Sequence, residues 1–487
     1  VCSQCNGDRI NQKALSVTVN GNTIAEVARY EIKELSAWIA QGKWSAVAKA
    51  IVEKMQTKIM LLDDLGVSHI TLDQPATELS ASEAQRIRVA NQLTAPLSDV
   101  LYVLDEPSIG LTSEENANMI AHLKHLVSKG NTVIVVEHDL DTIRNADWII
   151  DIGPKAGMKG GELLFNGTFS NFLKLKTLKD ISPTYQALTK DYVDLQGEEK
   201  VFLEEIRFAG CTAKNLKNID VAFKINALNV VNGKSGSGTK ALVIETLRKA
   251  MELQLKPESF QSVSAQSIEN LDRMDQLIFV DQSPIGRTPR SNPATYLGIS
   301  DSIRDLFASL PESKKRRYTK SRFSFNNKGG RCETCQGAGK IQMGMHFLGK
   351  VEILCGTCGG DRFNPETLEI KFNDKSIAAI YELSVEQALD FFMNEDLKAL
   401  QKIRNGLETL RDIGLGYLKL GQSSITLSGG EAQRIKIANQ LQKRDSGNAL
   451  YIIVEPSIGL HYSDLKSLLA MFFKIVDGGN TVVCIEQ

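Results

Sequence analysis

Several features are scarce or absent in this chain of 487 residues. No apolar run reaches the roughly 18 residues that a membrane-spanning helix requires, so an integral membrane protein is not expected. Lysine plus arginine (57) nearly balance aspartate plus glutamate (58), which leaves a formal net charge of -1. This balance excludes a basic field over the whole surface, so any nucleic-acid site must be a local patch. No secretory signal pattern is visible, which favours a reducing, cytoplasmic location.

The cysteines are few and unevenly spaced, and six of the eight form C-x-x-C pairs. The pairs are Cys2/Cys5, Cys332/Cys335 and Cys355/Cys358. Nineteen residues separate the last two pairs, a spacing typical of a closed Zn²⁺ site with four thiolate ligands rather than of uncoordinated thiols. The segment between them, 340–354, is expected to form a β-hairpin. The first pair resembles half of an equivalent site and cannot close one alone.

The sequence repeats itself over a long interval. Four segments match in the same order: CSQCNGDRI with CGTCGGDRF, LSASEAQRIRVANQL with LSGGEAQRIKIANQL, LYVLDEPSIGL with LYIIVEPSIGL, and GNTVIVVEH with GNTVVCIEQ. The offset between matching segments stays between 348 and 353 residues. A period this long indicates a duplicated module rather than a solenoid of short repeats.

Each copy contains short apolar segments that end in polar residues, at 101–106 and 132–138 in the first copy. Such segments are typical of buried parallel strands, and helical patterns lie between and after them. The sequence therefore predicts an α/β fold, with ligand chemistry at the carboxyl ends of the strands. We place the junction between the copies in the polar stretch 189–200.

The segment LSGGE in the second copy predicts a helix N-terminus that suits a phosphate group. Ser428 and Glu431 have the spacing of a capping box. The free N–H groups of the first helical turn attract an anion, and Gly429 and Gly430 place no side chain in its way. The alternative is an ordinary capped helix.

Two acidic residues end the first copy's apolar strand segment at 101–106. Asp105 is a candidate ligand for Mg²⁺ on a nucleotide, and Glu106 a candidate to orient or deprotonate water. His138 ends the next apolar segment, which we expect to be a neighbouring strand. The alternatives are a surface acidic pair and a structural histidine.

The stretch NGKSGSGTK resembles a phosphate-binding loop, G-x-x-x-x-G-K-[ST], with its last two residue types exchanged. Gly233 and Gly238 have the expected spacing, but Thr239 occupies the lysine position and Lys240 the hydroxyl position. We expect the loop to bind nucleotide weakly or without hydrolysis. The alternative is that the exchange of the two residue types reflects an altered or corrupted sequence. Candidate cradle residues between the two glycines are Ser235, Gly236 and Ser237.

Residues 314–331 contain eight lysines or arginines and no acidic residue. Tyr318, Phe323 and Phe325 alternate with them and are available for stacking on bases. Such a patch suits phosphate contacts, although a solvated basic loop is the alternative. The candidate DNA-binding residues are Arg287, Arg290, Lys314, Lys315, Arg316, Arg317, Lys320, Arg322, Lys328 and Arg331.

Together, LSGGE, LDEP and the strand-terminal histidine resemble an ABC-type ATPase. The segments 280–296, 322–341 and 345–348 further resemble the UvrA family, the damage-recognising subunit of the bacterial excision nuclease. The resemblance covers essentially the whole chain. It implies two P-loop ATPase modules with helical signature subdomains and a Cys₄ zinc module, using ATP, Mg²⁺ and Zn²⁺. It also implies a homodimer that binds damaged double-stranded DNA and a nuclease-loading repair partner, with the partner's docking domain and the first phosphate loop expected upstream of Val1.

The resemblance also implies boundaries for the parts of each module. We expect the first module's helical and signature region at 1–97 and its Walker B half at 98–195. The second module would comprise a phosphate-loop half at 200–285, a signature region with the zinc module at 286–440, and a shortened Walker B half at 441–487.

In ABC proteins each nucleotide lies between the phosphate loop of one module and the signature helix of the other. A first site would therefore combine Asp105, Glu106 and His138 with the helix that begins at Ser428. A second would combine the loop at 233–240 and Gln282 with the first copy's LSASE helix. The expected defects of the second site are Thr239, Lys240, Val454 in place of aspartate, Gln487 in place of histidine, and Ala81 and Ser82 with side chains facing the phosphate.

Three functions remain open from the sequence. The first is an ABC ATPase subunit that binds damaged DNA in nucleotide excision repair, with one degenerate nucleotide site. The second is a divergent paralogue that binds DNA or a DNA-intercalating drug and confers resistance. The third is a nucleic-acid-binding scaffold without ATPase activity.

Overall fold

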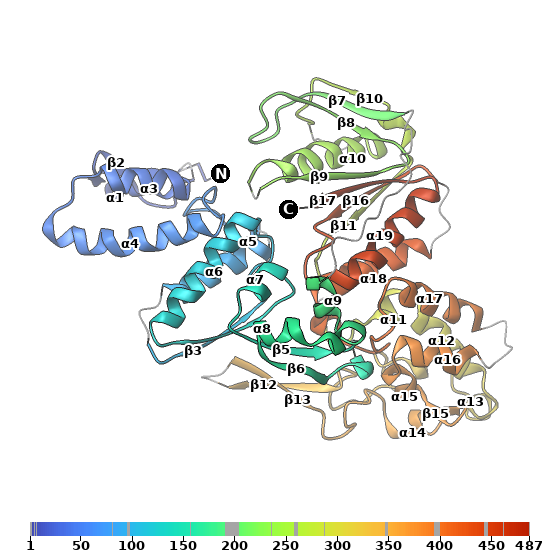
Figure 1. Cartoon of the computed structure of the whole chain (residues 1–487). Coiled ribbons are helices and arrows are strands. Elements are labelled where there is room, and N and C mark those ends of the chain that lie inside the picture. The colour runs from blue at the N-terminus through green and yellow to red at the C-terminus, as the bar shows by residue number, and fades with distance from the viewer. Residues whose placement is uncertain are drawn as a thin grey trace.

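The structure is a computed structural model that describes residues 2–486 with gaps. The gaps are residues 4, 6, 80, 95–97, 156, 190–203, 235, 258–261, 287, 346–348, 394–399, 443–446 and 461. Ser235, Arg287 and Gln487, and nearly all of the expected junction at 189–200, therefore lie outside the described residues. We call residues 2–189 the first module and residues 204–486 the second module. Figure 1 shows the first in blue to teal and the second in green to red.

The first module begins mainly with helices, and its described residues form three two-stranded sheets. Its helices are α1 (Gln12–Leu15), α2 (Ile24–Ala28), α3 (Ile32–Gln41), α4 (Ala46–Asp64), α5 (Ala81–Leu93), α6 (Ser113–Ser128), α7 (Leu140–Arg144), α8 (Phe169–Lys174) and α9 (Pro183–Thr189). Its strands are β1 (Thr18–Val19), β2 (Asn22–Thr23), β3 (Leu101–Asp105), β4 (Thr132–Val136), β5 (Trp148–Gly153) and β6 (Glu162–Thr168). Strands β3 and β4 pair in parallel, whereas β5 and β6 are antiparallel.

The second module is larger and contains a complete parallel sheet. Its strands are β7 (Glu205–Cys211), β8 (Ile219–Lys224), β9 (Leu228–Asn232), β10 (Ser267–Glu269), β11 (Gln276–Val280), β12 (Lys340–Met345), β13 (Gly349–Leu354), β14 (Lys371–Phe372), β15 (Lys375–Ser376), β16 (Ala449–Val454) and β17 (Thr481–Glu486). Four of them form a parallel sheet in the order β11-β16-β17-β9. A second sheet, β10-β7-β8, is antiparallel.

Helices surround this parallel sheet and form the signature region. They are η4 (Ala241–Arg248, a π-helix), α10 (Lys249–Leu255), α11 (Pro293–Tyr296), α12 (Ile299–Ser309), α13 (Pro311–Lys315), α14 (Pro365–Leu368), α15 (Ile377–Glu382), α16 (Val385–Met393), α17 (Gln401–Asp412), α18 (Gly429–Leu441) and α19 (Tyr462–Asp477). None of the helices in the described part of the chain is long and apolar enough to cross a membrane.

Both faces of the parallel sheet of the second module are buried, as the sequence predicts. All six residues of β16 are buried. Alternate side chains point to opposite faces, so Ile452 joins a core with η4 and α10 while Ile453 joins a core with α19. The sheet thus lies between two helical layers, the arrangement expected for buried parallel strands.

The prediction of buried strands is wrong for the first module. Tyr102 and Leu104 of β3 are buried and Leu104 packs against α6, but the alternate side chains of Leu101 and Val103 are 57% and 61% exposed. The physical reason is that helices cover only one face of the β3-β4 pair within the residues that the structure describes. The strand direction and pairing are nevertheless the same as in the second module.

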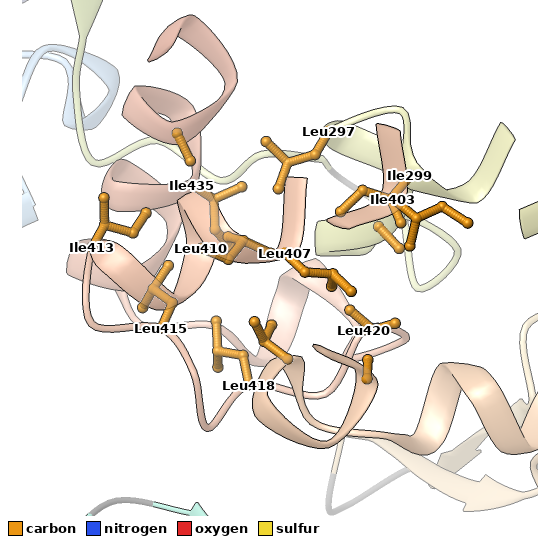
Figure 2. Packing of buried hydrophobic residues seen from close by; sticks show 14 of the residues in the cluster. Leu297, Ile299, Ile403, Leu407, Leu410, Ile413, Leu415, Leu418, Leu420 and Ile435 are labelled. Atoms are coloured by element: carbon orange, nitrogen blue, oxygen red, sulfur yellow. The ribbon is translucent and has the colours of Figure 1, made fainter. Parts of the chain in front are cut away.

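The largest hydrophobic core lies in the signature region of the second module and extends onto the parallel sheet. Leucine and isoleucine side chains from α12, α17, α18 and the segment 413–420 interdigitate there (Figure 2). Gly406 permits the close approach of α17 and α12, because a Cβ atom at this position would lie 2.8 Å from Cγ1 of Ile299. This core fixes the position of the N-terminus of α18.

Equivalent residues of the sequence repeat make equivalent contacts. Asn131 Oδ1 accepts a hydrogen bond from the backbone N–H of Val100 (3.1 Å), and Asn480 Oδ1 accepts one from Ala449 (3.0 Å). Each asparagine also donates a 3.1 Å bond to a carbonyl five residues earlier in the chain. The duplication inferred from the sequence is therefore also present in the structure.

Candidate nucleotide sites and zinc centre

The four parallel strands of the second module end together. Glu486 pairs with Asn232, Val454 with Ile485, and Val280 with Ile453. The segments that follow the strands therefore meet at one edge of the sheet. They carry the glycine-rich loop at 233–240, Gln282 and Glu455, three features that are far apart in the sequence.

The glycine-rich loop is tightly folded and leads into a helix, as a phosphate loop does. Ser237 donates its backbone N–H to the carbonyl of Lys234 (2.9 Å), and Asn215 Nδ2 donates to the carbonyl of Gly236 (2.8 Å). A Cβ atom on Gly233 would lie 2.5 Å from Ser237 Oγ, so a larger residue there would require the Ser237 side chain to move. The loop is thus compact, and a cradle of its backbone N–H groups stays a prediction.

Lys240 lies against the strand-end glutamate of its own module. Its Nζ is 3.0 Å from Oε1 of Glu455, whose side chain is 7% exposed, against 38% for Lys240. Gln282 donates its Nε2–H to the backbone carbonyl of Glu455 (2.9 Å). The loop, the β11 end and the β16 end are thus joined through Glu455.

The residues at this edge do not fit Mg²⁺. The cation prefers oxygen ligands, and the strand-end position that carries Asp105 in the first module carries the alkyl side chain of Val454 here. The carboxylate of Glu455 already has an ammonium group beside it. A divalent cation bound here would be repelled by the ammonium of Lys240, which stands where the phosphate-loop pattern has a hydroxyl ligand.

Helix α18 begins at the predicted capping box. Glu431 N–H donates to Ser428 Oγ (3.2 Å), and Ser428 N–H donates to Glu431 Oε2 (2.8 Å). Tyr417 OH also donates to Glu431 Oε1 (2.6 Å), which fixes the carboxylate. Gly429 and Gly430 form the first turn. The helix end thus keeps N–H groups available for an anion, as its sequence predicts.

The strand-end residues of the first module are held by their own signature helix. Gln85 of α5 donates Nε2–H bonds to the backbone carbonyls of Asp105 (2.8 Å) and Glu106 (2.9 Å). His138 Nε2 lies 3.5 Å from Glu106 Oε1. The predicted neighbourhood of Glu106 and His138 is therefore present, because β3 and β4 are adjacent.

The two modules meet at this glutamate. A Cβ atom on Gly459 of the second module would lie 3.2 Å from Oε2 of Glu106. A cavity of about 800 Å³ opens beside them, and its lining includes His138 of the first module together with Ser428, Arg434 and Gly459 of the second. Of the predicted members of the first nucleotide site, His138 and Ser428 thus line one cleft, and Glu106 lies beside its Gly459.

The modules also meet at the glycine-rich loop. A Cβ atom on Gly236 would lie 2.7 Å from Cγ of His69, and His69 Nε2 is 2.9 Å from Oε1 of Glu83 in α5. Lys234 Nζ is 2.7 Å from Glu114 Oε2 at the start of α6. The LSASE helix of the first module is therefore close to the loop of the second, as cross-module pairing predicts.

One detail of this prediction is wrong. Ser82 is only 3% exposed, so its side chain is packed into the protein and does not face a phosphate in the cleft. The side chain of Ala81 lies outside the described part of the structure. His69, Lys234 and Glu114 could not be predicted from the sequence, because a half-buried histidine or a surface ion pair carries no local signal of a partner in the other module.

The four cysteines at 332–358 converge. Their sulfur atoms all lie within 4.8 Å of one another, with Sγ–Sγ distances of 3.9 Å for Cys332/Cys355 and 3.7 Å for Cys335/Cys358. A tetrahedron of thiolates about 2.3 Å from Zn²⁺ has edges of about 3.8 Å, whereas a disulfide bond is about 2.05 Å long. The cluster therefore fits zinc.

The surroundings of the cluster act differently on its thiols. The backbone N–H of Cys358 lowers the pKa of the Cys355 thiol to about 7, whereas burial raises the pKa of the Cys335 and Cys358 thiols, so it is the sulfur geometry that supports the metal. Strands β12 and β13 between the two pairs form the predicted hairpin. Cys2 and Cys5 belong to no group of three or more metal-binding side chains among the described residues.

The basic stretch 314–331 is less available than its sequence suggests. Phe323 and Phe325 are 0% and 3% exposed and belong to the core, so the expectation that they stack on bases is wrong. Their apolar rings are more stable against the signature helices than in water. Half of the eight cations are paired with carboxylates, namely Arg316 with Glu312 and Glu369, Lys320 with Asp305, Arg322 with Glu366 and Arg331 with Glu333.

The other four cations of the stretch form an exposed group. Lys314, Lys315, Arg317 and Lys328 are exposed and form no ion pair with the described residues. Arg290 is half-buried at the turn before α11. The described surface therefore offers a smaller basic group than the sequence count indicates.

Comparison with known proteins gives a consistent result, although no family model matches the chain. The chain is 45% identical over 490 residues to UvrABC system protein A of Staphylococcus epidermidis, covering 100% of this chain and 51% of that protein. It is also 45% identical over 502 residues to UvrABC system protein A of Thermus thermophilus, with the same two coverages. The crystal structure of UvrA2 from Deinococcus radiodurans matches with a TM-score of 0.88 at 40% identity, over 100% of this chain and 60% of that one. The chain thus spans about half the length of the curated relatives it matches.

Proposed function

The chain belongs to the UvrA family, and from this premise we propose that it forms part of an ABC-type ATPase subunit that binds damaged double-stranded DNA in nucleotide excision repair. The observation that carries the proposal is the cleft in which Glu106 and His138 of the first module face Ser428 and Gly459 of the second. An ABC-type site requires catalytic strand-end side chains from one module and an anion-binding helix N-terminus from the other.

We assign roles at the first site accordingly. Asp105 holds the Mg²⁺ of the bound ATP, and Glu106 accepts a proton from the attacking water. His138 lies 3.5 Å from Glu106 and orients the carboxylate. The N-terminus of α18, at Ser428, Gly429, Gly430 and Glu431, binds the terminal phosphate through backbone N–H groups.

The second site has a different role in this proposal. Backbone N–H groups of residues 233–240 bind nucleotide, and Gln282 connects the bound state to Glu455 through its 2.9 Å hydrogen bond. Lys240 and Val454 replace Mg²⁺ ligands, so we propose that this site does not hydrolyse ATP. The boundaries given above for the parts of each module belong to the same proposal.

DNA binds the exposed basic group in this proposal, through Lys314, Lys315, Arg317 and Lys328, with Arg290 nearby in sequence. Arg287 lies outside the described residues and stays a sequence-based candidate. The paired cations Arg316, Lys320, Arg322 and Arg331 then support the fold around the Zn²⁺ site rather than contact phosphate. A homodimer in the cytoplasm and a nuclease-loading partner complete the proposal.

The experiment compares binding and turnover in the protein as the cell makes it. Fluorescence anisotropy with a duplex that carries one bulky adduct, and with the undamaged duplex, is expected to show tighter binding of the damaged duplex. ATP turnover is measured in parallel, with Glu106→Gln as the variant. Equal binding of the two duplexes, or turnover that Glu106→Gln leaves unchanged, would overturn the proposal.

A further inference from the structure

The glycine-rich loop and the end of β16 carry two substitutions that together remove oxygen ligands and add one positive charge. Lys240 stands where the phosphate-loop pattern has a hydroxyl, and Val454 stands where the first module has Asp105. Two oxygen ligands for Mg²⁺ are thus replaced by one ammonium and one alkyl group. We propose that the Lys240 ammonium takes the place of the metal, so that the second site binds a nucleoside triphosphate without Mg²⁺ and keeps it intact. This inference depends on the nucleotide site proposed above.

The position of the ammonium fits this role. Lys240 is the last residue of the loop, and its Nζ lies 3.0 Å from Oε1 of Glu455, at the edge where the parallel strands end. An ammonium has three N–H donors, so the bond to Glu455 leaves two for phosphate oxygens. The Lys240 side chain is 38% exposed and is therefore accessible to a ligand, whereas Glu455 is almost fully buried.

The same arrangement disfavours a metal ion. A divalent cation beside Glu455 would lie within a few ångströms of the ammonium and would be repelled by it. Displacing Lys240 would leave the lysine without its buried partner, and Val454 offers no oxygen in exchange. A monovalent cation that is covalently part of the chain is always present, which removes the need for metal during binding.

The arrangement also explains a site without hydrolysis. An ammonium beside a carboxylate holds one of its oxygens in a charge-assisted contact. Glu455 has such a partner at 3.0 Å, whereas the equivalent Glu106 lies 3.5 Å from a histidine ring. The Lys240 ammonium therefore compensates the phosphate charge and at the same time keeps Oε1 of Glu455 from positioning a water molecule.

The test measures the binding of the fluorescent analogue mant-ATP in excess EDTA and in excess MgCl₂. The native protein is expected to bind mant-ATP in EDTA, and Lys240→Ser is expected to weaken that binding at least tenfold. Lys240→Arg, which keeps a cation, is expected to restore most of it. The double variant Lys240→Ser/Val454→Asp is expected to bind in MgCl₂ at least tenfold more tightly than in EDTA.

Lys249→Ser is the matched control. Lys249 forms a comparable pair with Glu245 farther along the same helical segment, with a side chain 37% exposed, and its loss should leave binding in EDTA unchanged. Thermal unfolding shows whether each variant is folded. Native binding that disappears in EDTA, or binding in EDTA that Lys240→Ser leaves unchanged, would overturn the inference. Either result leaves the proposed function intact, because damage-selective DNA binding and the effect of Glu106→Gln on turnover are measured separately.

Discussion

Glu106 and Glu455 are equivalent residues of the two modules with different surroundings. Each follows a parallel strand, has positive φ (45° and 51°), and donates its backbone N–H to the next strand, to Val136 (2.9 Å) and Ile485 (2.8 Å). Glu106 lies beside His138 and Gly459, which line a cleft between the modules, whereas Glu455 is buried beside Lys240. The duplicated backbone is thus the same at both glutamates, while the charged or titratable partner of each glutamate differs.

The largest expected effect separates the two glutamates directly. Glu106→Gln should lower ATP turnover by about 10²–10⁴-fold, the range typical for loss of a general base. Glu455→Gln should change turnover less than twofold, because its carboxylate is already held by an ammonium. Steady-state phosphate release by the two variants, each checked for folding, measures the difference. Similar losses in both variants would mean that the modules are equivalent after all.

The cysteine pairs provide a second contrast between the modules. Cys355→Ser should lower the free energy of unfolding of the second module by about 3 kcal/mol or more, because loss of a structural metal is among the most damaging changes. In the 487-residue chain by itself, Cys5→Ser in the first module should have a much smaller effect, since Cys5 joins no cluster among the described residues. Thermal unfolding and zinc content by mass spectrometry measure both variants. Zinc bound at full stoichiometry by Cys355→Ser would contradict the assignment.

The basic stretch of the second module allows a finer test. The double variant Lys314→Ala/Arg317→Ala should reduce the slope of log K against log salt for duplex DNA by about 2, because each phosphate contact contributes about 0.9. Arg322→Ala should leave the slope unchanged, since Arg322 pairs with Glu366 and lies over the ring of Tyr318. Salt titrations of DNA binding distinguish the two outcomes. A larger change for Arg322→Ala would show that its ion pair opens to bind DNA.

The smallest expected effect concerns the contact between the modules. Lys234→Ala should change the free energy of unfolding only slightly, because both Lys234 and Glu114 are mostly exposed. A double-mutant cycle with Glu114→Ala, read by urea unfolding, isolates the pair. A coupling above about 2 kcal/mol would indicate that this contact holds the modules together.

Local signals in the sequence predicted much of the site. The capping box at Ser428 and Glu431, the hairpin between the cysteine pairs and the parallel strands of the second module are all present. Each depends on residues close together in the chain or on a strong apolar pattern. The α/β fold was predicted for the same reason, whereas its ABC type was implied by the resemblance of the LSGGE and LDEP motifs to a known family.

Other features depend on long-range packing and could not be predicted. The exposed face of β3 and the burial of Phe323 reflect which helices cover which surface, and local composition does not contain this information. The contact of Lys240 with Glu455 joins residues from different halves of the second module. The sequence showed that Lys240 is unusual, but only the fold shows its partner.

The positive φ of Glu455 determines what a substitution by glycine at this position would gain and lose. A left-handed backbone costs an ordinary residue roughly 1–2 kcal/mol, whereas glycine adopts it freely. Replacing this glutamate by glycine would therefore relieve conformational strain if the side chain had become idle. The side chain is instead buried and paired with Lys240, so Glu455→Gly would exchange the backbone strain for an ammonium that has lost its carboxylate partner.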